Sequence, residues 1–277
     1  MVGIRSYCQG MNAPRDLLRQ IVVISAVVFM LIAAAVGTGA FGGTPVQDLQ
    51  DGALDADASL LAPATPAFSI WSVIYILLIA YAIWQALPSQ RTRDRQRAIG
   101  WLVAVTAVLN GLWLVLAQFA TLPLTVLGFV LLLVALCVTF RKTVTEPGRG
   151  VLDSLLIDGV TGLHLGWVSL ATVANTAAWL TATGPADWAA AGEVLAFVVL
   201  AVVAVIGVGI AWASRWRIAP GLALAWGLSW LAVGRLVTEP QSTVVGIAAI
   251  VVAVIVIAVP LVGTVIDRAA QVSNAGA

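Results

Sequence analysis

The chain has 277 residues, of which 61% are hydrophobic and only 10% are charged, and its formal net charge is +1. Soluble domains carry about 25% charged residues, and the mean hydropathy here is +1.03. The composition therefore excludes a soluble protein and predicts an integral membrane protein that contacts the lipid bilayer. It also supplies no basic surface for nucleic acid. With two cysteines and one histidine, we expect no disulfide framework and no metal site.

Eight apolar runs are long enough to cross a bilayer as helices, because about 20 helical residues span its hydrocarbon core. The short alternating segments of an outer-membrane barrel are absent from the sequence, so we expect an all-α integral membrane protein. The predicted spans are 20–41, 67–87, 98–119, 122–140, 152–181, 190–213, 218–237 and 243–266.

Positive charge is divided unevenly between the connections. Of the 14 Lys and Arg residues, all except Arg235 flank the termini or lie in alternate connections, whereas residues 42–66 contain four aspartates and no Lys or Arg. Because basic loops stay in the cytoplasm, we predict that both termini are cytoplasmic in a multi-pass protein of the plasma membrane, or of the inner membrane if the source is bacterial. A cleaved signal peptide is the alternative for the first span, but its apolar run of about 21 residues favours an uncleaved anchor.

Polar and aromatic side chains recur at helical spacing in the second, third and fifth spans. Two interpretations stay open for the aromatic residues, because a belt at the membrane interface also collects Trp and Tyr, whereas a ligand pocket requires the rings on one face. The amide of Asn110, near the middle of the third span, needs a partner in protein or in a cavity, and a contact between helices is the simpler alternative to a ligand contact. The only histidine, His164, is a candidate for function because it is ionisable within a span, and a structural role for it is equally open.

Three further features concern packing and charge. Gly162 and Gly166 form a GxxxG pair on the face opposite the polar residues of the fifth span, which favours close approach of another helix. Arg235 and Glu239 are four residues apart and predict an ion pair in which the arginine reaches towards the membrane surface. Asp158 is the carboxylate nearest to His164 along the fifth span.

The segments PAFSIWSVIY, LNGLW and GWVSLATVANTAAWL resemble the second, third and fifth helices of the TspO/MBR family, the tryptophan-rich sensory and translocator proteins. The resemblance covers about residues 20–181 and implies a five-helix bundle that is often a homodimer, with a pocket for a tetrapyrrole near the first connection. The predicted ligand-binding residues are Phe68, Trp71, Tyr75, Asn110, Trp113, His164, Trp167, Ala171 and Asn175.

The chain departs from the family pattern at two places. The family commonly has Pro-Tyr ahead of the fifth-helix tryptophan, where this chain has Leu163 and His164, and residues 42–66 lack the usual tryptophan. Porphyrin breakdown is therefore not expected, and we predict neither catalytic residues nor a required cofactor. The predicted organisation is a cytoplasmic segment 1–19, a TspO-like bundle 20–181, a three-helix membrane extension 182–267 and a cytoplasmic tail 268–277.

The resemblance thus predicts a membrane protein that binds a tetrapyrrole, a porphyrin or haem precursor, or another flat apolar small molecule, in a sensory or carrier role. The alternative is a secondary transporter of a small molecule. Such carriers commonly use carboxylates within the membrane and interrupted helices, and Asp158, beside a glycine-rich stretch, is the candidate for that role.

Overall fold

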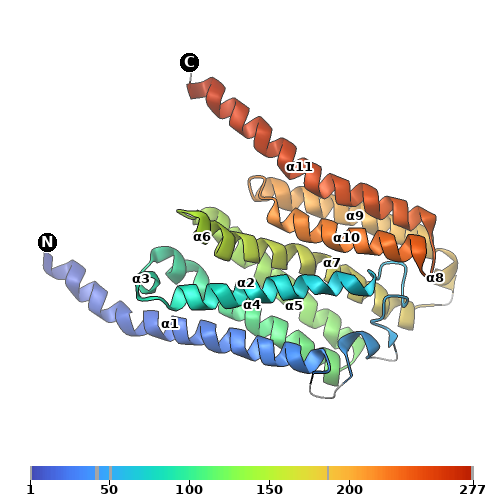
Figure 1. The fold of residues 1–277 in the computed structure, drawn as a ribbon, viewed down its shortest axis with the longest axis horizontal. Coiled ribbons are helices and arrows are strands. Elements are labelled where there is room, and N and C mark those ends of the chain that lie inside the picture. The colour runs from blue at the N-terminus through green and yellow to red at the C-terminus, as the bar shows by residue number, and fades with distance from the viewer. Residues whose placement is uncertain (1, 41–43, 50–51, 186, 276–277) are drawn as a thin grey trace.

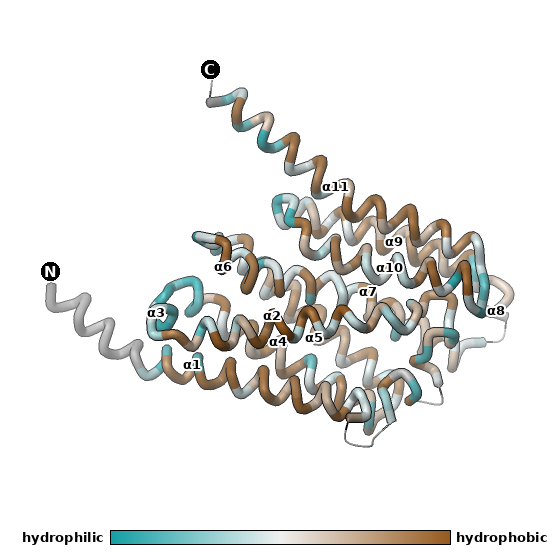
Figure 2. Tube along the Cα trace, viewed as in Figure 1, coloured by the Kyte–Doolittle hydropathy of each residue, from teal (hydrophilic) through white to brown (hydrophobic). Residues whose placement is uncertain are grey.

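The computed structural model describes residues 2–40, 44–49, 52–185 and 187–275, and within these ranges it contains helices and connections only (Figure 1). Eight helical spans in the described ranges are long and apolar enough to cross a membrane, which confirms the predicted number. Hydrophobic residues run along these spans, and hydrophilic residues gather at the ends of the bundle (Figure 2). The chain is an all-α, multi-pass integral membrane protein.

Six spans are single helices, the second begins with a 3₁₀ turn, and the fifth contains a π-helical stretch. In chain order they are α1 (Val2–Gly37), η3 (Thr65–Ser69) with α2 (Ile70–Ala86), α4 (Asp94–Phe119), α5 (Leu122–Thr145), α6 (Val151–Asp153) with η4 (Ser154–Gly159) and α7 (Val160–Thr183), α9 (Gly192–Ala213), α10 (Ala219–Val237) and α11 (Thr243–Ala275). The short helices η1 (Val46–Asp48), α3 (Pro88–Arg91) and α8 (Asp187–Ala190) lie in connections.

Prolines mark several helix starts, because the ring pre-sets the helical φ and the missing N–H would have no partner in the first turn. Pro66, Pro88, Pro123 and Pro220 occupy first-turn positions of η3, α3, α5 and α10. At the other end of the first span, α1 ends at Gly37, and the predicted end at residue 41 lies outside the described residues.

The spans do not pack in chain order. Helix α1 packs against α2 and α4, α4 against α5, and α5 against α7. Helix α10 then packs between α7 and α11, and α9 packs mainly on α11. The last three spans therefore lie beside the first five, with α10 as the helix that joins the two groups (Figure 1).

Both termini lie at the same end of the bundle as α3 and α6, and segment 52–64 and α8 lie at the opposite end (Figure 1). We predict that the end with the termini faces the cytoplasm, because it carries the basic connections. In a background without native cysteines, Asp55→Cys should react with a membrane-impermeant maleimide in intact cells, and Arg93→Cys should react only in opened membranes. Reaction of Arg93→Cys from outside would contradict this orientation.

The GxxxG face of α7 packs closely against the start of α10. A Cβ added to Gly166 would lie 2.1 Å from the backbone oxygen of Pro220, and one added to Gly162 would lie 2.8 Å from the Cβ of Ala219. The two glycines therefore let the backbones of the two helices approach each other, which confirms that this face accepts a neighbouring helix.

Gly166→Ala should lower the free energy of unfolding by roughly 1–3 kcal/mol, because the new methyl group would push the α10 backbone away. Denaturant unfolding in one detergent checks this. Gly209→Ala in α9 is the matched control, since the added Cβ there meets no heavy atom of another part of the described chain within 4 Å. Equal stability of the Gly166→Ala variant and the parent would contradict the close helix contact.

Candidate functional site

A cavity lies between α2, α4, α5 and α7 at the end of the bundle opposite the termini, and residues of segment 52–63 complete its lining there. Its volume is about 50 Å³, whereas sites for drug-sized ligands occupy roughly 300–1,000 Å³. The cavity therefore has to enlarge before it accepts a larger guest. Its lining residues are Val46, Ala53, Leu54, Asp55, Ala62, Pro63, Phe68, Trp71, Trp113, Phe129, Trp167, Leu170, Ala171, Ala174, Asn175 and Ala178.

Aromatic rings from five elements form the wall, with Trp71 of α2 at its centre. The Trp71 ring stacks on Trp113 with centroids 6.3 Å apart, and it meets Trp167 edge-on at 6.0 Å. Phe68 contacts Trp167 edge-on at 6.0 Å, and Phe129 of α5 lies 4.2 Å from Trp113. Flat rings held in this way offer faces and edges on which a planar guest can pack.

Small side chains on the next turns of α7 leave the remaining space. Ala171, Ala174 and Ala178 line the cavity together with Asn175. The Asn175 amide donates from Nδ2 to the backbone oxygen of Ala171 at 3.0 Å, and its buried Oδ1 finds no partner in the described part of the chain. This part of the wall therefore combines low volume with one free hydrogen-bond acceptor.

Six of the nine predicted ligand-binding residues line the cavity, and Tyr75, Asn110 and His164 do not. These three lie one turn farther from segment 52–64 along their helices. Tyr75 stacks on Trp71 with centroids 5.4 Å apart and donates its hydroxyl to Asn110 Oδ1 at 3.1 Å. The His164 ring meets Trp71 edge-on at 5.7 Å. Tyr75 and His164 therefore support the Trp71 ring from the side that faces away from segment 52–64.

Several buried polar atoms around the cavity lack a hydrogen-bond partner among the described residues. They are Asn110 Nδ2, Trp113 Nε1, His164 Nε2, Trp167 Nε1 and Asn175 Oδ1. Buried polar groups are nearly always paired in folded proteins, so a cluster of unpaired ones beside a cavity provides hydrogen-bonding capacity for water or for a guest.

The predicted ion pair between Arg235 and Glu239 is wrong. The Arg235 side chain is only 1% exposed, and it donates from Nη1 to the backbone oxygen of Ser59 at 3.0 Å and from Nη2 to that of Ala56 at 2.9 Å. The guanidinium points inward to the first connection, because two backbone carbonyls there accept its hydrogen bonds.

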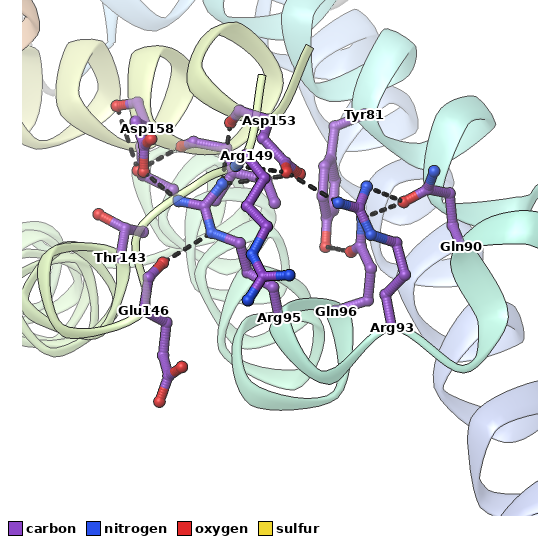
Figure 3. A network of polar contacts seen from close by, with 12 residues as sticks. Tyr81, Gln90, Arg93, Arg95, Gln96, Thr143, Glu146, Arg149, Asp153 and Asp158 are labelled. Atoms are coloured by element: carbon purple, nitrogen blue, oxygen red, sulfur yellow. Dashed lines mark hydrogen bonds and ion pairs between the residues drawn. The ribbon is translucent and has the colours of Figure 1, made fainter. Parts of the chain in front are cut away.

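Asp158, the candidate coupling carboxylate, is held by two guanidinium groups at the end of the bundle that carries the termini. Arg95 of α4 binds the Asp158 carboxylate and also donates to the backbone oxygens of Glu146 at 2.7 Å and Asp153 at 3.1 Å (Figure 3). Arg217, just before α10, donates to Asp158 Oδ1 at 2.9 Å. These contacts tie α4, the fifth span and the start of α10 together.

Arg93 extends the network by pairing with Asp153 Oδ2 at 3.1 Å and donating to Gln90 Oε1 at 3.0 Å (Figure 3). Asp158 lies within η4, the π-helical stretch. Stretches of this kind widen a helix locally and often carry function, but here the carboxylate serves as the shared anion for arginines of two other segments.

Sequence reasoning missed Leu170, Ala174 and Ala178 on α7 and, from other elements, two further groups of cavity residues. Phe129 is one of two phenylalanines, with Phe140, in a span whose other apolar residues are mostly aliphatic, and no helical pattern marks it as facing inward. The residues of segment 52–63 are mostly Ala, Leu and Pro, which carry no binding signature. Both reach the cavity only because the tertiary fold brings α5 and the first connection to the same end of α7.

Comparison with known proteins adds one match. A family model described as TSPO-like protein matches residues 19–262, while no curated protein and no solved structure was found to match. The match continues past residue 181, where the resemblance noted in the sequence ends, and takes in α9, α10 and most of α11. Since it covers most of the chain, the protein belongs to the family of TSPO-like proteins.

Proposed function

We propose that this protein binds a tetrapyrrole, a porphyrin or haem precursor, in the cavity beneath segment 52–63, and acts as a sensor or carrier without converting its ligand. The observation that carries the proposal is the wall of tryptophan rings from α2, α4 and α7, with Trp71 stacked on Trp113 and edge-on to Trp167. A planar macrocycle gains the most from such a wall, because it buries a large flat area against the rings.

The unpaired polar atoms support a ligand with hydrogen-bonding groups at its edge. The indole N–H groups of Trp113 and Trp167 lie in the cavity wall as buried donors that no described residue pairs with. Oxygen acceptors on a guest would satisfy donors that otherwise carry a desolvation cost of about 1–3 kcal/mol each. A tetrapyrrole with carboxylate side chains combines such acceptors with a flat apolar body.

Titration of the purified protein with protoporphyrin, haem and a sterol tests the proposal through tryptophan fluorescence. We expect saturable quenching by a tetrapyrrole, and its absence for both tetrapyrroles would overturn the proposal. Trp71→Ala should weaken binding at least about fivefold, because an aromatic pair contributes roughly 1 kcal/mol beyond its buried area. Trp212→Ala is the control, since that ring in α9 is 72% exposed on the outside of the bundle, and its removal should leave affinity unchanged.

A further inference from the structure

Helix α10 contacts segment 52–64, a part of the first connection that lines the cavity. Ala53, Leu54, Asp55, Ala62 and Pro63 of segment 52–64 line the cavity. The cavity volume of about 50 Å³ is small beside the roughly 300 Å³ or more of a typical ligand site. A large ligand therefore fits against the tryptophan wall only when the cavity enlarges, and movement of this segment, which supplies five of the lining residues, would enlarge it.

Three hydrogen-bonding groups of α10 fasten the segment and the residues that follow it. Arg235 donates to the backbone oxygens of Ser59 at 3.0 Å and Ala56 at 2.9 Å. The backbone oxygen of Trp230 accepts from the Ala64 N–H at 3.2 Å, and Trp226 Nε1 donates to the Ala67 oxygen at 2.9 Å. The contacts follow one another along the second half of α10, between Trp226 and Arg235, so this part of the helix holds the segment and the residues after it.

The hydrogen bonds of Arg235 should be the strongest of these contacts, because their donor carries a charge. Hydrogen bonds from a charged donor are about twice as strong as neutral ones, and this guanidinium is 1% exposed. Its two hydrogen-bond acceptors among the described residues are the segment's carbonyls, and its Nε has no partner. If the segment lifted, the buried charge would lose both acceptors, which is costly in a medium of low polarity.

We infer that Arg235 is a latch that holds segment 52–64 closed over the cavity, so that α10, and with it the last three helices, controls how fast a ligand enters and leaves. Arg235 is a positioning residue in this scheme, since it acts through the segment and touches no ligand. The role of the latch in ligand exchange rests on the proposed function, but the latch itself is testable without any ligand.

The test measures opening of the segment by cysteine alkylation. In a background without native cysteines, Ala62→Cys places a thiol at a cavity-lining position that is 8% exposed. Its reaction rate with a water-soluble maleimide then reports how often the segment lifts. Adding Arg235→Met should raise this rate at least about tenfold, because two hydrogen bonds from a charged group are lost. Adding Trp226→Phe, which removes one neutral donor, should raise it less.

Arg217→Met is the matched control. It removes a partly buried arginine contact at the opposite end of the α10 region, where Arg217 donates to Thr143 and Asp158. Unchanged alkylation in both Arg235→Met and Trp226→Phe would overturn the latch, as would an equal rise in Arg217→Met. If Arg235→Met fails to fold, Trp226→Phe and Arg235→Lys take its place. The proposal is then rejected if the alkylation rate rises in neither variant.

Ligand kinetics separate the latch from the proposed function. With protoporphyrin as the probe, Arg235→Met should raise the association and the dissociation rate together in stopped-flow fluorescence and change the Kd less than either rate. Slower or unchanged exchange would overturn the control of access. Faster alkylation without protoporphyrin binding in the parent or the variant would uphold the latch and reject tetrapyrrole binding.

Discussion

Ala171→Phe should weaken tetrapyrrole binding at least about 100-fold, equivalent to about 2.8 kcal/mol, and leave the fold intact. Ala171 lines the cavity on α7, one turn beyond Trp167. A phenyl ring at this position occupies the space that a guest needs against the tryptophan wall. Because the new ring can extend towards segment 52–63, it displaces a guest more than it displaces the helices.

Fluorescence titration with protoporphyrin measures the loss of affinity, and thermal unfolding in the same detergent measures stability. Ala201→Phe in α9 is the matched control, since Ala201 is exposed on the outer surface of the bundle and the same substitution there should change neither quantity. Parental affinity in Ala171→Phe would show that the ligand binds elsewhere and would reject the cavity as the site.

Asp158→Asn should lower the free energy of unfolding by roughly 3 kcal/mol, the lower end of the range for breaking a buried ion pair from one side, because this cluster is partly exposed. The Asp158 side chain is 14% exposed, and its partners Arg95 and Arg217 are 8% and 23% exposed. Asparagine keeps the size of the side chain but leaves two guanidinium groups without their shared anion. The loss should be large, because these groups join α4, the fifth span and the start of α10.

Denaturant unfolding in detergent checks this result. Asp94→Asn is the control, because the Asp94 side chain is 97% exposed in its ion pair with Arg97 and exposed pairs contribute little. Parental stability in Asp158→Asn would contradict the structural role of this carboxylate. It would also strengthen the alternative of a secondary transporter, for which Asp158 is the coupling candidate.

The helical spans follow from local properties of the sequence. Each span needs about 20 apolar residues because lipid cannot satisfy backbone hydrogen bonds, and this condition is visible in every segment without knowledge of its neighbours. Helical periodicity in the same way placed Trp167, Ala171 and Asn175 on one face of α7 and Gly162 and Gly166 on another. The structure brings the first face to the cavity and the second to α10.

Residues that depend on a partner in another span were misjudged or missed. Arg235 looked like a surface cation paired with Glu239, because only residues on its own helix were known, and its acceptors lie about 180 positions earlier, at Ala56 and Ser59. His164 and Asn110 share the inward faces of their helices with cavity residues, yet they lie one turn too deep to line the cavity. Depth along a span depends on how helices shift past each other, which periodicity does not record.

By itself, the sequence determined that this protein is a bundle of eight membrane helices and which faces of the second, third and fifth spans point inward. Only the tertiary structure decided that α10 packs on α7, that Phe129 joins the cavity wall, and that Arg235 holds the segment that lines the cavity. The physical reason is that hydrophobicity acts on each span separately in lipid, whereas the choice of neighbours depends on shape, small residues and hydrogen bonds between spans.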